Sequence, residues 1–412
     1  MKTPSGIGQP QLRANRGVMS TISRRGFISA SSSGLVAAGL ASVGGVAETS
    51  PARARDRKAG GMTLGCQSSP TSDEHFAFLA RYGIANVVAQ PIQSDPSRLY
   101  ATVDELVALR ALGQKHGLSV DMTSARFMSS GGKPSNIILG HEGRDEEIEA
   151  FQMLLKNCAA AGIPALKYNL ALMPILRSAV VPGRGDSSNH RWRVSEMKDS
   201  PLMTIWDGAS MIGEPEVHTA PYDQVAYFKQ LAGHVTADDL WERITYFLDR
   251  VVPVADQYKV RMALHPEDPG VPPGGYHGVP RVLGTIEGLK KFVGIQESAY
   301  HGLAFCQGTI SEDLEDPAHQ IYEVIRWFGE RKKIFLVHFR NVRGGRDDVV
   351  IEIFPDEGSV DMAKAIKAYR DVGYGGMLVP DHVPFGPPGS ERENFAFCYG
   401  YIRGLLQSLV VS

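Results

Sequence analysis

The sequence predicts an α/β protein with a single (β/α)8 TIM barrel and a long insertion after the fourth strand. From residue 61 onward, short runs rich in β-forming residues alternate with longer stretches in which apolar residues recur at three- and four-residue spacing. Four residues of metal-binding type also stand where four of these runs end. Because the carboxyl ends of parallel barrel strands meet at one mouth, we expect those four residues to lie together.

Each element follows from its own pattern. The eight predicted strands cover residues 62–66, 86–90, 118–123, 165–170, 261–265, 302–306, 334–339 and 376–381. The amphipathic segments between and after them cover residues 73–82, 103–116, 146–161, 237–258, 315–328, 360–372 and 392–408. A strand and helix repeated in this way predicts one barrel over residues 56–412 rather than several domains.

The insertion covers residues 173–235 and is rich in Pro and Gly with mixed charge. A structureless loop of this length is uncommon inside a compact domain. We expect a lid, a segment that covers the substrate or an oligomer contact, and a surface decoration is an equal alternative.

The first 55 residues differ in composition from the rest of the chain. Arg24 and Arg25 are followed by Phe27, a weakly apolar stretch over 28–47, and small residues at cleavage spacing over 52–54. This anatomy predicts a twin-arginine signal over 1–55 and a periplasmic or extracellular protein exported in folded form. A disordered tail or an uncleaved anchor is the alternative. No other stretch approaches the ~20 apolar residues of a spanning helix, so we expect no membrane span after cleavage.

Charge and cysteine content narrow the partners. The formal net charge is −2, from 43 basic and 45 acidic residues, which argues against a nucleic-acid partner and favours a small molecule. Four widely spaced cysteines are too few for a disulfide framework. We also expect a homo-oligomer, either a dimer or a tetramer.

The four residues at the ends of predicted strands five to eight are His265, Cys306, His338 and Asp381. Two neutral imidazoles, a thiolate and a carboxylate balance the charge of a divalent ion and leave room for substrate oxygens. The carboxylate favours Mn²⁺, whereas the thiolate shifts the preference toward Fe²⁺, Co²⁺ or Zn²⁺. Each residue alone is more often a packed side chain than a ligand.

Other polar residues stand near the same strand ends. We expect His382, Arg340 and Tyr168 to be catalytic, and Asn169, Arg281 and Arg340 to bind the substrate. His382 follows Asp381, where an imidazole titrates near neutrality and can act as acid or base; its alternative is to orient that carboxylate. Surface ion pairs are the alternative for the arginines, and filling of the barrel is the alternative for Tyr168.

The motifs in the second half of the chain resemble those of the D-mannonate dehydratase family. They are Val260-Arg-Met-Ala-Leu-His-Pro-Glu-Asp-Pro269, Gly278-Val-Pro-Arg281, Phe305-Cys-Gln-Gly308, Val337-His-Phe-Arg340, Gly358-Ser-Val-Asp-Met362 and Pro380-Asp-His382. Tyr168-Asn169 followed by Met173-Pro174 fits the same pattern. The resemblance is strong over 251–382 and weaker over 73–173.

This resemblance implies a xylose-isomerase-like barrel that removes water from D-mannonate in hexuronate degradation, giving 2-keto-3-deoxy-D-gluconate with Mn²⁺ (or Fe²⁺) as cofactor. By resemblance the four residues at the strand ends are the metal ligands. His382 matches the family's acid/base histidine, and Arg340 and Asn169 match residues that orient the sugar acid.

The chain departs from the family pattern at positions that we expect to recognise the substrate. Gln90 and Pro355 stand where the family carries histidines, and Val383 replaces a glycine. Two alternatives therefore stay open. One is a sugar isomerase or epimerase on the same metal-dependent barrel, and the other is an exported sugar-acid-binding protein without turnover.

Overall fold

The computed structural model describes residues 61–409, apart from residues 69, 129–133, 174, 197–201, 204–233, 271–274, 276–277, 347–348 and 388. The predicted leader and twin-arginine signal (1–55) lie outside the described residues. So do residues 197–201 and 204–233 of the insertion.

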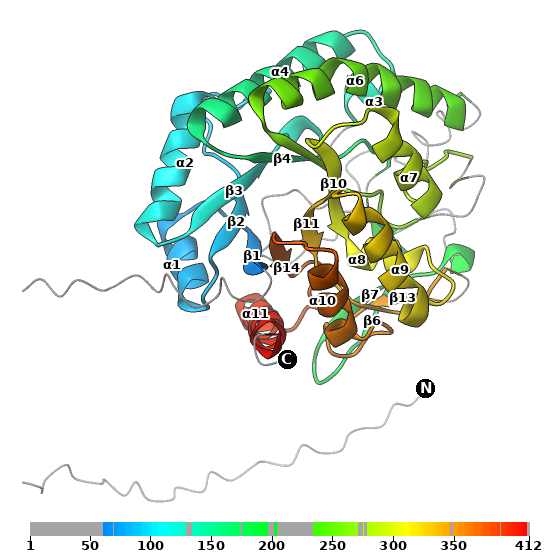
Figure 1. Ribbon diagram of the computed structural model, residues 1–412. Helices are drawn as coiled ribbons and strands as arrows, with labels where there is room; N and C mark the ends of the chain where they lie inside the picture. The colour runs from blue at the N-terminus through cyan, green and yellow to red at the C-terminus, as the bar shows by residue number, and fades with distance from the viewer. Residues whose placement is uncertain are drawn as a thin grey trace, which may run out of the picture. The chain divides into compact units, whose positions relative to one another are not determined.

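Eight parallel strands close a barrel in the order β1-β14-β11-β10-β9-β4-β3-β2 (Figure 1). They are β1 (Thr63–Ser68), β2 (Asn86–Ala89), β3 (Ser119–Ser124), β4 (Ala165–Tyr168), β9 (Arg261–Leu264), β10 (His301–Cys306), β11 (Ile334–His338) and β14 (Met377–Val379). Each coincides with one of the eight predicted runs. The predicted single (β/α)8 barrel is therefore confirmed.

Helices surround the barrel (Figure 1). They are α1 (Asp73–Arg81), α2 (Val103–Lys115), α3 (Asn136–Leu139), α4 (Arg144–Ala161), α6 (Ala237–Tyr258), α7 (Ile286–Ile295), α8 (Gln307–Glu312), α9 (Pro317–Glu330), α10 (Met362–Asp371) and α11 (Glu391–Ser408). All seven predicted helical segments are present. The sequence analysis missed α3, α7 and α8, of which α3 and α8 are too short for a repeated apolar pattern to be evident.

Helix starts follow local chemistry. Thr102 accepts a hydrogen bond from the Glu105 backbone N–H while the Glu105 carboxylate accepts one from the Thr102 backbone N–H. Thr236 and Asp239 form the same reciprocal pair at the start of α6. Each pair satisfies two backbone donors that would otherwise lack a helical partner. Both helices therefore begin at a defined residue.

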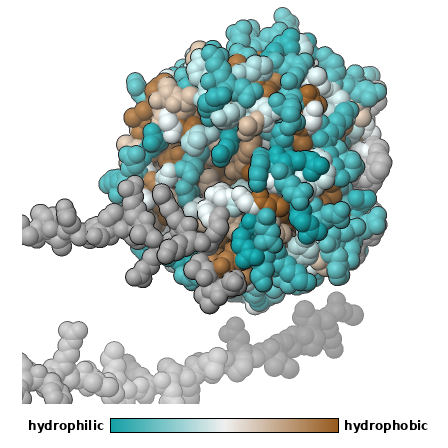
Figure 2. Space-filling model, viewed as in Figure 1, coloured by the Kyte–Doolittle hydropathy of each residue, from teal (hydrophilic) through white to brown (hydrophobic). Residues whose placement is uncertain are grey.

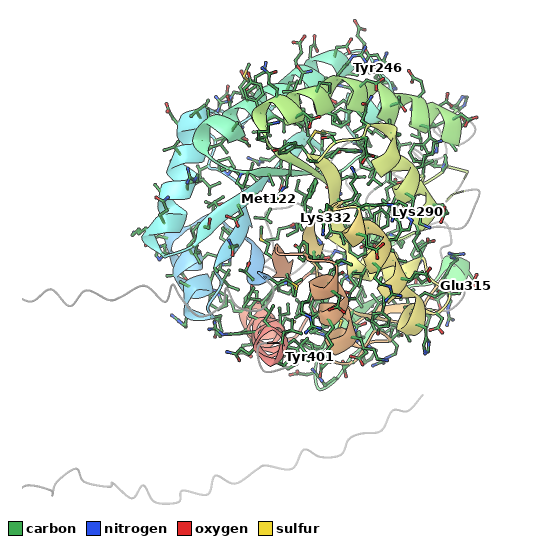
Figure 3. The ribbon with its side chains drawn as sticks, viewed as in Figure 1. Met122, Tyr246, Lys290, Glu315, Lys332 and Tyr401 are labelled. Carbon is green, nitrogen blue, oxygen red and sulfur yellow. The ribbon has the colours of Figure 1, made fainter. Side chains whose placement is uncertain are left out.

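The core has two layers, one inside the barrel and one between strands and helices. The inner cluster contains Met122, Ala263, Ala304 and Leu336 among others. Figure 3 shows Met122 within the ring of strands, whereas Tyr246 lies on the outer helices. Figure 2 shows hydrophilic residues over most of the visible face, with hydrophobic ones in scattered groups. The helices thus direct their apolar residues inward.

Part of the insertion forms a second sheet. Strands β6 (Ala179–Pro182) and β7 (Ser188–Trp192) pair as a hairpin, and β7 pairs with β13 (Val350–Glu352), which in turn pairs with β12 (Val342–Arg343). A separate pair joins β5 (Leu176–Arg177) to β8 (Leu202–Met203). The β6–β7 hairpin of the insertion therefore pairs with the chain that follows β11.

Among the described helices, none combines the length and the apolar character needed to cross a membrane.

Candidate metal centre and adjoining charge network

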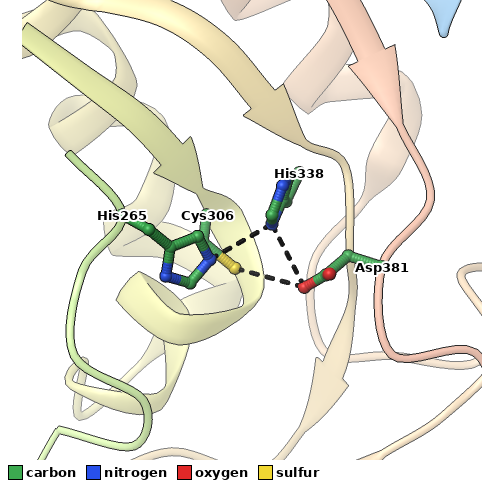
Figure 4. Close-up of side chains that lie close together, drawn as sticks. All are labelled: His265, Cys306, His338 and Asp381. Atoms are coloured by element: carbon green, nitrogen blue, oxygen red, sulfur yellow. Dashed lines mark hydrogen bonds and ion pairs between the residues drawn. The ribbon is translucent and has the colours of Figure 1, made fainter. Parts of the chain in front are cut away.

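Four strands deliver the four predicted metal ligands to one place. Cys306 and His338 are the last residues of β10 and β11, His265 follows β9 directly, and Asp381 lies two residues past β14. The four side chains are buried, and their ligand atoms all lie within 4.8 Å of one another (Figure 4). The structure thus brings the predicted set together at the carboxyl ends of the strands.

The distances fit one divalent ion. His265 Nε2 lies 3.2 Å from His338 Nδ1, and His338 Nδ1 lies 3.3 Å from Asp381 Oδ2. Cys306 Sγ lies 3.7 Å from the same Asp381 oxygen. Ligands bound at about 2.0–2.3 Å to one ion stand roughly 3–3.7 Å apart. Two imidazoles, a sulfur and a carboxylate also form a donor set that divalent transition metals accept.

The atoms that face away from the centre have partners of their own. His265 Nδ1 lies 2.7 Å from the Pro266 carbonyl, and His338 Nε2 lies 3.2 Å from Gln67 Oε1. Both partners are acceptors, so each imidazole carries its proton on the outer nitrogen and directs a lone pair to the centre. This arrangement fixes the tautomer that a metal ligand needs.

Electrostatics at the centre also favour a cation. Burial lowers the pKa of His265 well below its usual value and lowers that of His338, so both imidazoles are neutral. Burial raises the pKa of the Cys306 thiol to about 12. Burial opposes ionisation of Asp381, but cationic neighbours that include His382 and Arg340 outweigh burial and hold the pKa of Asp381 well below its usual value. The thiol would need a bound cation to ionise.

Beside the four ligands lies a buried charge network built around Arg340. One guanidinium nitrogen lies 2.6 Å from Glu352 Oε1, and the other lies 3.0 Å from Asp268 Oδ2 and 2.9 Å from Glu312 Oε1. The Thr309 hydroxyl lies 3.0 Å from Asp268 Oδ2 and 3.1 Å from Cys306 Sγ. Thr309 therefore joins the network to the metal ligands.

Arg177, from the insertion, is the second cation of this network. Its Nη1 lies 2.7 Å from Asp268 Oδ1, its Nη2 pairs with Glu352 Oε1, and its side chain is 1 % exposed. His190 on β7 lies 3.3 Å from the other Glu352 oxygen. Sequence analysis missed both residues, because nothing in an irregular insertion indicated which side chains turn inward.

The network balances its own charge. Burial would raise the pKa values of Asp268 and Glu352, but Arg177 and the other cations outweigh burial and hold both pKa values below their usual range. Burial and the neighbouring Asp268 raise the pKa of Glu312 to about 8. Two guanidinium cations therefore face the carboxylates of Asp268 and Glu352, and Glu312 is the carboxyl group of the network that ionises least readily.

His382 stands between the two groups. Its Nδ1 lies 2.5 Å from Glu352 Oε1, and its Nε2 lies 3.7 Å from Asp381 Oδ2. Burial lowers the pKa of His382, but Asp381 and Glu352 outweigh burial and raise it above the ordinary value. Its φ of 46° is in the left-handed region, which few residues other than glycine adopt without cost. The surrounding contacts hold this imidazole against the metal ligands.

Gly308 in the Cys-Gln-Gly motif has a steric role. A Cβ at this position would lie 2.0 Å from Arg340 Nε. Only glycine lets the guanidinium approach α8 so closely.

The structure changes the interpretation of three predicted residues. Tyr168 packs at 5.2 Å from the Phe151 ring and 5.7 Å from the Phe247 ring, on α4 and α6 outside the barrel. It is a core residue rather than a catalytic one. Arg340 contacts three protein carboxylates, and its predicted role toward substrate stays a prediction. Arg281 donates to the carbonyl oxygens of residues 269 (3.0 Å) and 173 (3.4 Å), which holds two loops together.

The remaining predicted substrate-binding residue, Asn169, follows β4 and is half-buried. Its backbone N–H donates to the Met128 carbonyl at 2.8 Å. Its role toward substrate stays a prediction. Strand alternation could have indicated a different residue, because Lys167 must face opposite to Tyr168 and therefore into the barrel.

Four side chains of metal-binding type at the mouth of a (β/α)8 barrel, with a histidine and buried arginines beside them, define a barrel enzyme with a candidate metal centre. A sequence model of the D-mannonate dehydratase (UxuA) family matches residues 78–410. The chain belongs to this family, and with it to the hydro-lyases.

Relatives agree with this assignment. The mannonate dehydratase of Thermotoga petrophila is 28 % identical over 322 residues, which cover 74 % of this chain and 86 % of that protein. The crystal structure of mannonate dehydratase from Streptococcus suis superposes with a TM-score of 0.68 at 22 % identity, covering 84 % of this chain and 95 % of that one. A xylose isomerase domain protein from Planctomyces limnophilus superposes with a TM-score of 0.50 at 11 % identity, covering 85 % and 99 %. The last two show the fold, which is xylose-isomerase-like as expected.

Proposed function

We propose that this protein removes water from a sugar acid, with D-mannonate as substrate and 2-keto-3-deoxy-D-gluconate as product. The observation that carries the proposal is the convergence of His265, Cys306, His338 and Asp381 at the barrel mouth in a chain of this family. We further propose Mn²⁺, or Fe²⁺, as the resident ion. The carboxylate suits Mn²⁺ and the thiolate suits Fe²⁺.

The reaction needs a base to accept the proton that leaves C2 and an acid to protonate the hydroxyl that leaves C3 as water; the enol that results tautomerises to the 2-keto acid. A divalent ion held by the four ligands would act as a Lewis acid that makes the C2 proton more acidic. His382 would give a proton to the departing hydroxyl, because its Nε2 lies at the edge of the ligand cluster, 3.7 Å from Asp381 Oδ2. Glu352 holds the opposite nitrogen and so sets the direction of the ring.

Arg340 and Arg177 act as positioning residues in this scheme. Both contact Glu352, which contacts His382, and Arg340 also reaches Thr309 next to Cys306. A rigid network of this kind fixes the position of the proton donor, His382, relative to the metal ligands. The insertion contributes Arg177, so at least this part of the insertion belongs to the active site.

The test is a substrate screen on the purified full-length protein loaded with Mn²⁺. We expect D-mannonate, within a panel of hexonates, to give a 2-keto-3-deoxy acid detected by periodate and thiobarbiturate, and chelator-treated protein to give none. Release of no keto acid from any hexonate would overturn the proposal. Exchange of the C2 proton with solvent without loss of water would instead select an isomerase or epimerase, and binding without reaction would select a sugar-acid-binding protein.

A further inference from the structure

Lys167 is a buried cation inside the barrel mouth. It lies on β4, is 9 % exposed, and its Nζ donates to Gln67 Oε1 at 2.7 Å. β1, which carries Gln67, is three strands away from β4 in the barrel order, so this hydrogen bond crosses the lumen. Among the residues that the structure describes, no carboxylate lies at ion-pair distance from this ammonium group. Its hydrogen-bond partner among these residues is therefore a neutral amide.

Gln67 connects the lysine to the metal ligands. Its Oε1 lies 3.2 Å from His338 Nε2 and also accepts the hydrogen bond from Lys167. With the oxygen turned toward two donors, the amide nitrogen of Gln67 points elsewhere and is a donor. Lys167 and Gln67 thus offer N–H groups beside the candidate metal centre.

The positive charge of Lys167 would lack a compensating anion once the metal centre is occupied. Burial lowers the pKa of Lys167 to about 8, against the opposing effect of Asp381 and Cys306. A divalent ion at the centre would compensate both of those anions, and the lysine would then face no uncompensated negative charge of the ligand cluster. A buried ammonium group is costly unless an anion pairs with it. Lys333, the other buried lysine among the described residues, has such a partner in Glu297 at 3.3 Å.

We propose that Lys167 and Gln67 form an anion subsite that binds the carboxylate of the substrate beside the metal. This inference rests on the proposed function, and it names the residues that select an acid over a neutral sugar. The ammonium group has three N–H donors and Gln67 takes one, so two can reach a carboxylate. Of the arginines expected for this role, Arg340 contacts protein carboxylates and Arg281 donates to loop carbonyls, which leaves the lysine as the cation that serves the ligand.

The test separates binding from turnover. Equilibrium binding of D-mannonate and of the neutral polyol D-mannitol is measured by calorimetry on the Mn²⁺-loaded full-length protein and on its Lys167→Met variant, each also carrying His382→Asn so that the bound acid is not consumed. We expect the variant to bind the acid about 10- to 100-fold more weakly, as loss of a charged hydrogen bond implies, with mannitol binding and metal content unchanged. Lys333→Met is the matched control, because it removes an equally buried lysine from the other end of the barrel and should leave acid binding unchanged.

A second variant covers the case in which Lys167→Met does not fold. Gln67→Glu places a carboxylate beside Lys167 and occupies the subsite from within, so it should weaken acid binding to a similar degree while the protein stays folded. Metal content is measured in both variants because Gln67 also contacts His338.

The outcomes separate this inference from the proposed function. Unchanged acid affinity in Lys167→Met, an equal loss for acid and polyol, or no acid binding by the unmodified protein would each overturn the anion subsite. If the unmodified protein binds D-mannonate without releasing a keto acid and Lys167→Met loses that binding, the dehydratase proposal fails while the subsite stands.

Discussion

Two buried clusters lie side by side at the barrel mouth, and they differ in whether their charged groups are paired within the cluster. The ligand cluster consists of His265, Cys306, His338 and Asp381, and the charge network consists of Arg177, Asp268, Glu312, Arg340, Glu352 and His382. Within the network, cations and carboxylates satisfy one another. The ligand cluster has lone pairs directed at a common point and no cation of its own. The ligand cluster is therefore suited to bind a cation, whereas the charge network keeps its side chains in fixed positions.

The comparison also explains why arginines are not metal-site residues here. A guanidinium group is charged at all accessible pH values and would repel a divalent ion placed among its own carboxylates. Asp268, Glu352 and His382 lie close enough to one another to hold an ion, but Arg177 and Arg340 already occupy that role. The two clusters should consequently respond differently to mutation.

The largest effect is expected at the ligand cluster. His338→Asn and Asp381→Asn should each abolish Mn²⁺ retention and lower turnover on the order of 1,000-fold, because a ligand is lost from a centre on which the reaction depends. Metal content by elemental analysis and the rate of keto-acid release are the measurements. The unmodified protein should gain thermal stability on Mn²⁺ addition, and these variants should not.

His301→Asn is the control for this pair, because it alters a buried histidine at the opposite end of β10, where the ring contacts the Phe292 carbonyl at 3.0 Å. It should keep the metal. Full metal retention in both ligand variants would contradict the assignment of the centre.

The next effect is expected in the charge network, and in stability more than in metal content. Arg177→Met should lower the free energy of unfolding by about 3–5 kcal/mol, because it leaves Asp268 and Glu352 buried with one cation fewer. Turnover should fall by about 10- to 100-fold through misplacement of His382, while bound Mn²⁺ is retained. Urea unfolding and metal analysis measure the two responses.

Arg184→Met is the matched control from the same insertion. Its ion pair with Asp356, at 2.7 Å, is 43 % exposed on the arginine side, so its loss should cost no more than about 1 kcal/mol. A double-mutant cycle of Arg177→Met with Arg340→Met should be non-additive, because both cations share Glu352. Additive losses would show that the network is not one unit.

The two clusters were not equally predictable from sequence. The ligand cluster follows from strand ends: a parallel barrel has one catalytic mouth, and a run of β-forming residues marks where each strand stops. The network depends on loops instead. Arg177 comes from the insertion and Glu312 from a short helix of one and a half turns or so, and neither position has a periodic pattern that says which side chain is buried.

Strand alternation gives a rule that the sequence analysis did not apply. β4 ends in Lys167 and Tyr168, and only one of two neighbouring strand residues can face the barrel interior. Tyr168 was chosen for its hydroxyl, but a large aromatic ring fits the layer between strands and helices, where Phe151 and Phe247 receive it. The lysine, which a strand core rarely tolerates, was the more informative residue.

The smallest effect is therefore expected at Tyr168, just outside both clusters. Among the described residues its hydroxyl has no hydrogen-bond partner, and the ring is 1 % exposed. Tyr168→Phe should leave kcat and KM within about twofold and should change the free energy of unfolding by no more than about 1 kcal/mol, with stabilisation the expected sign because an unpaired buried hydroxyl is removed. Tyr168→Ala should cost about 3–5 kcal/mol through the cavity it leaves. A large loss of kcat in the phenylalanine variant, with stability unchanged, would return Tyr168 to the catalytic set and would mean that the boundary of the active site extends beyond the barrel interior.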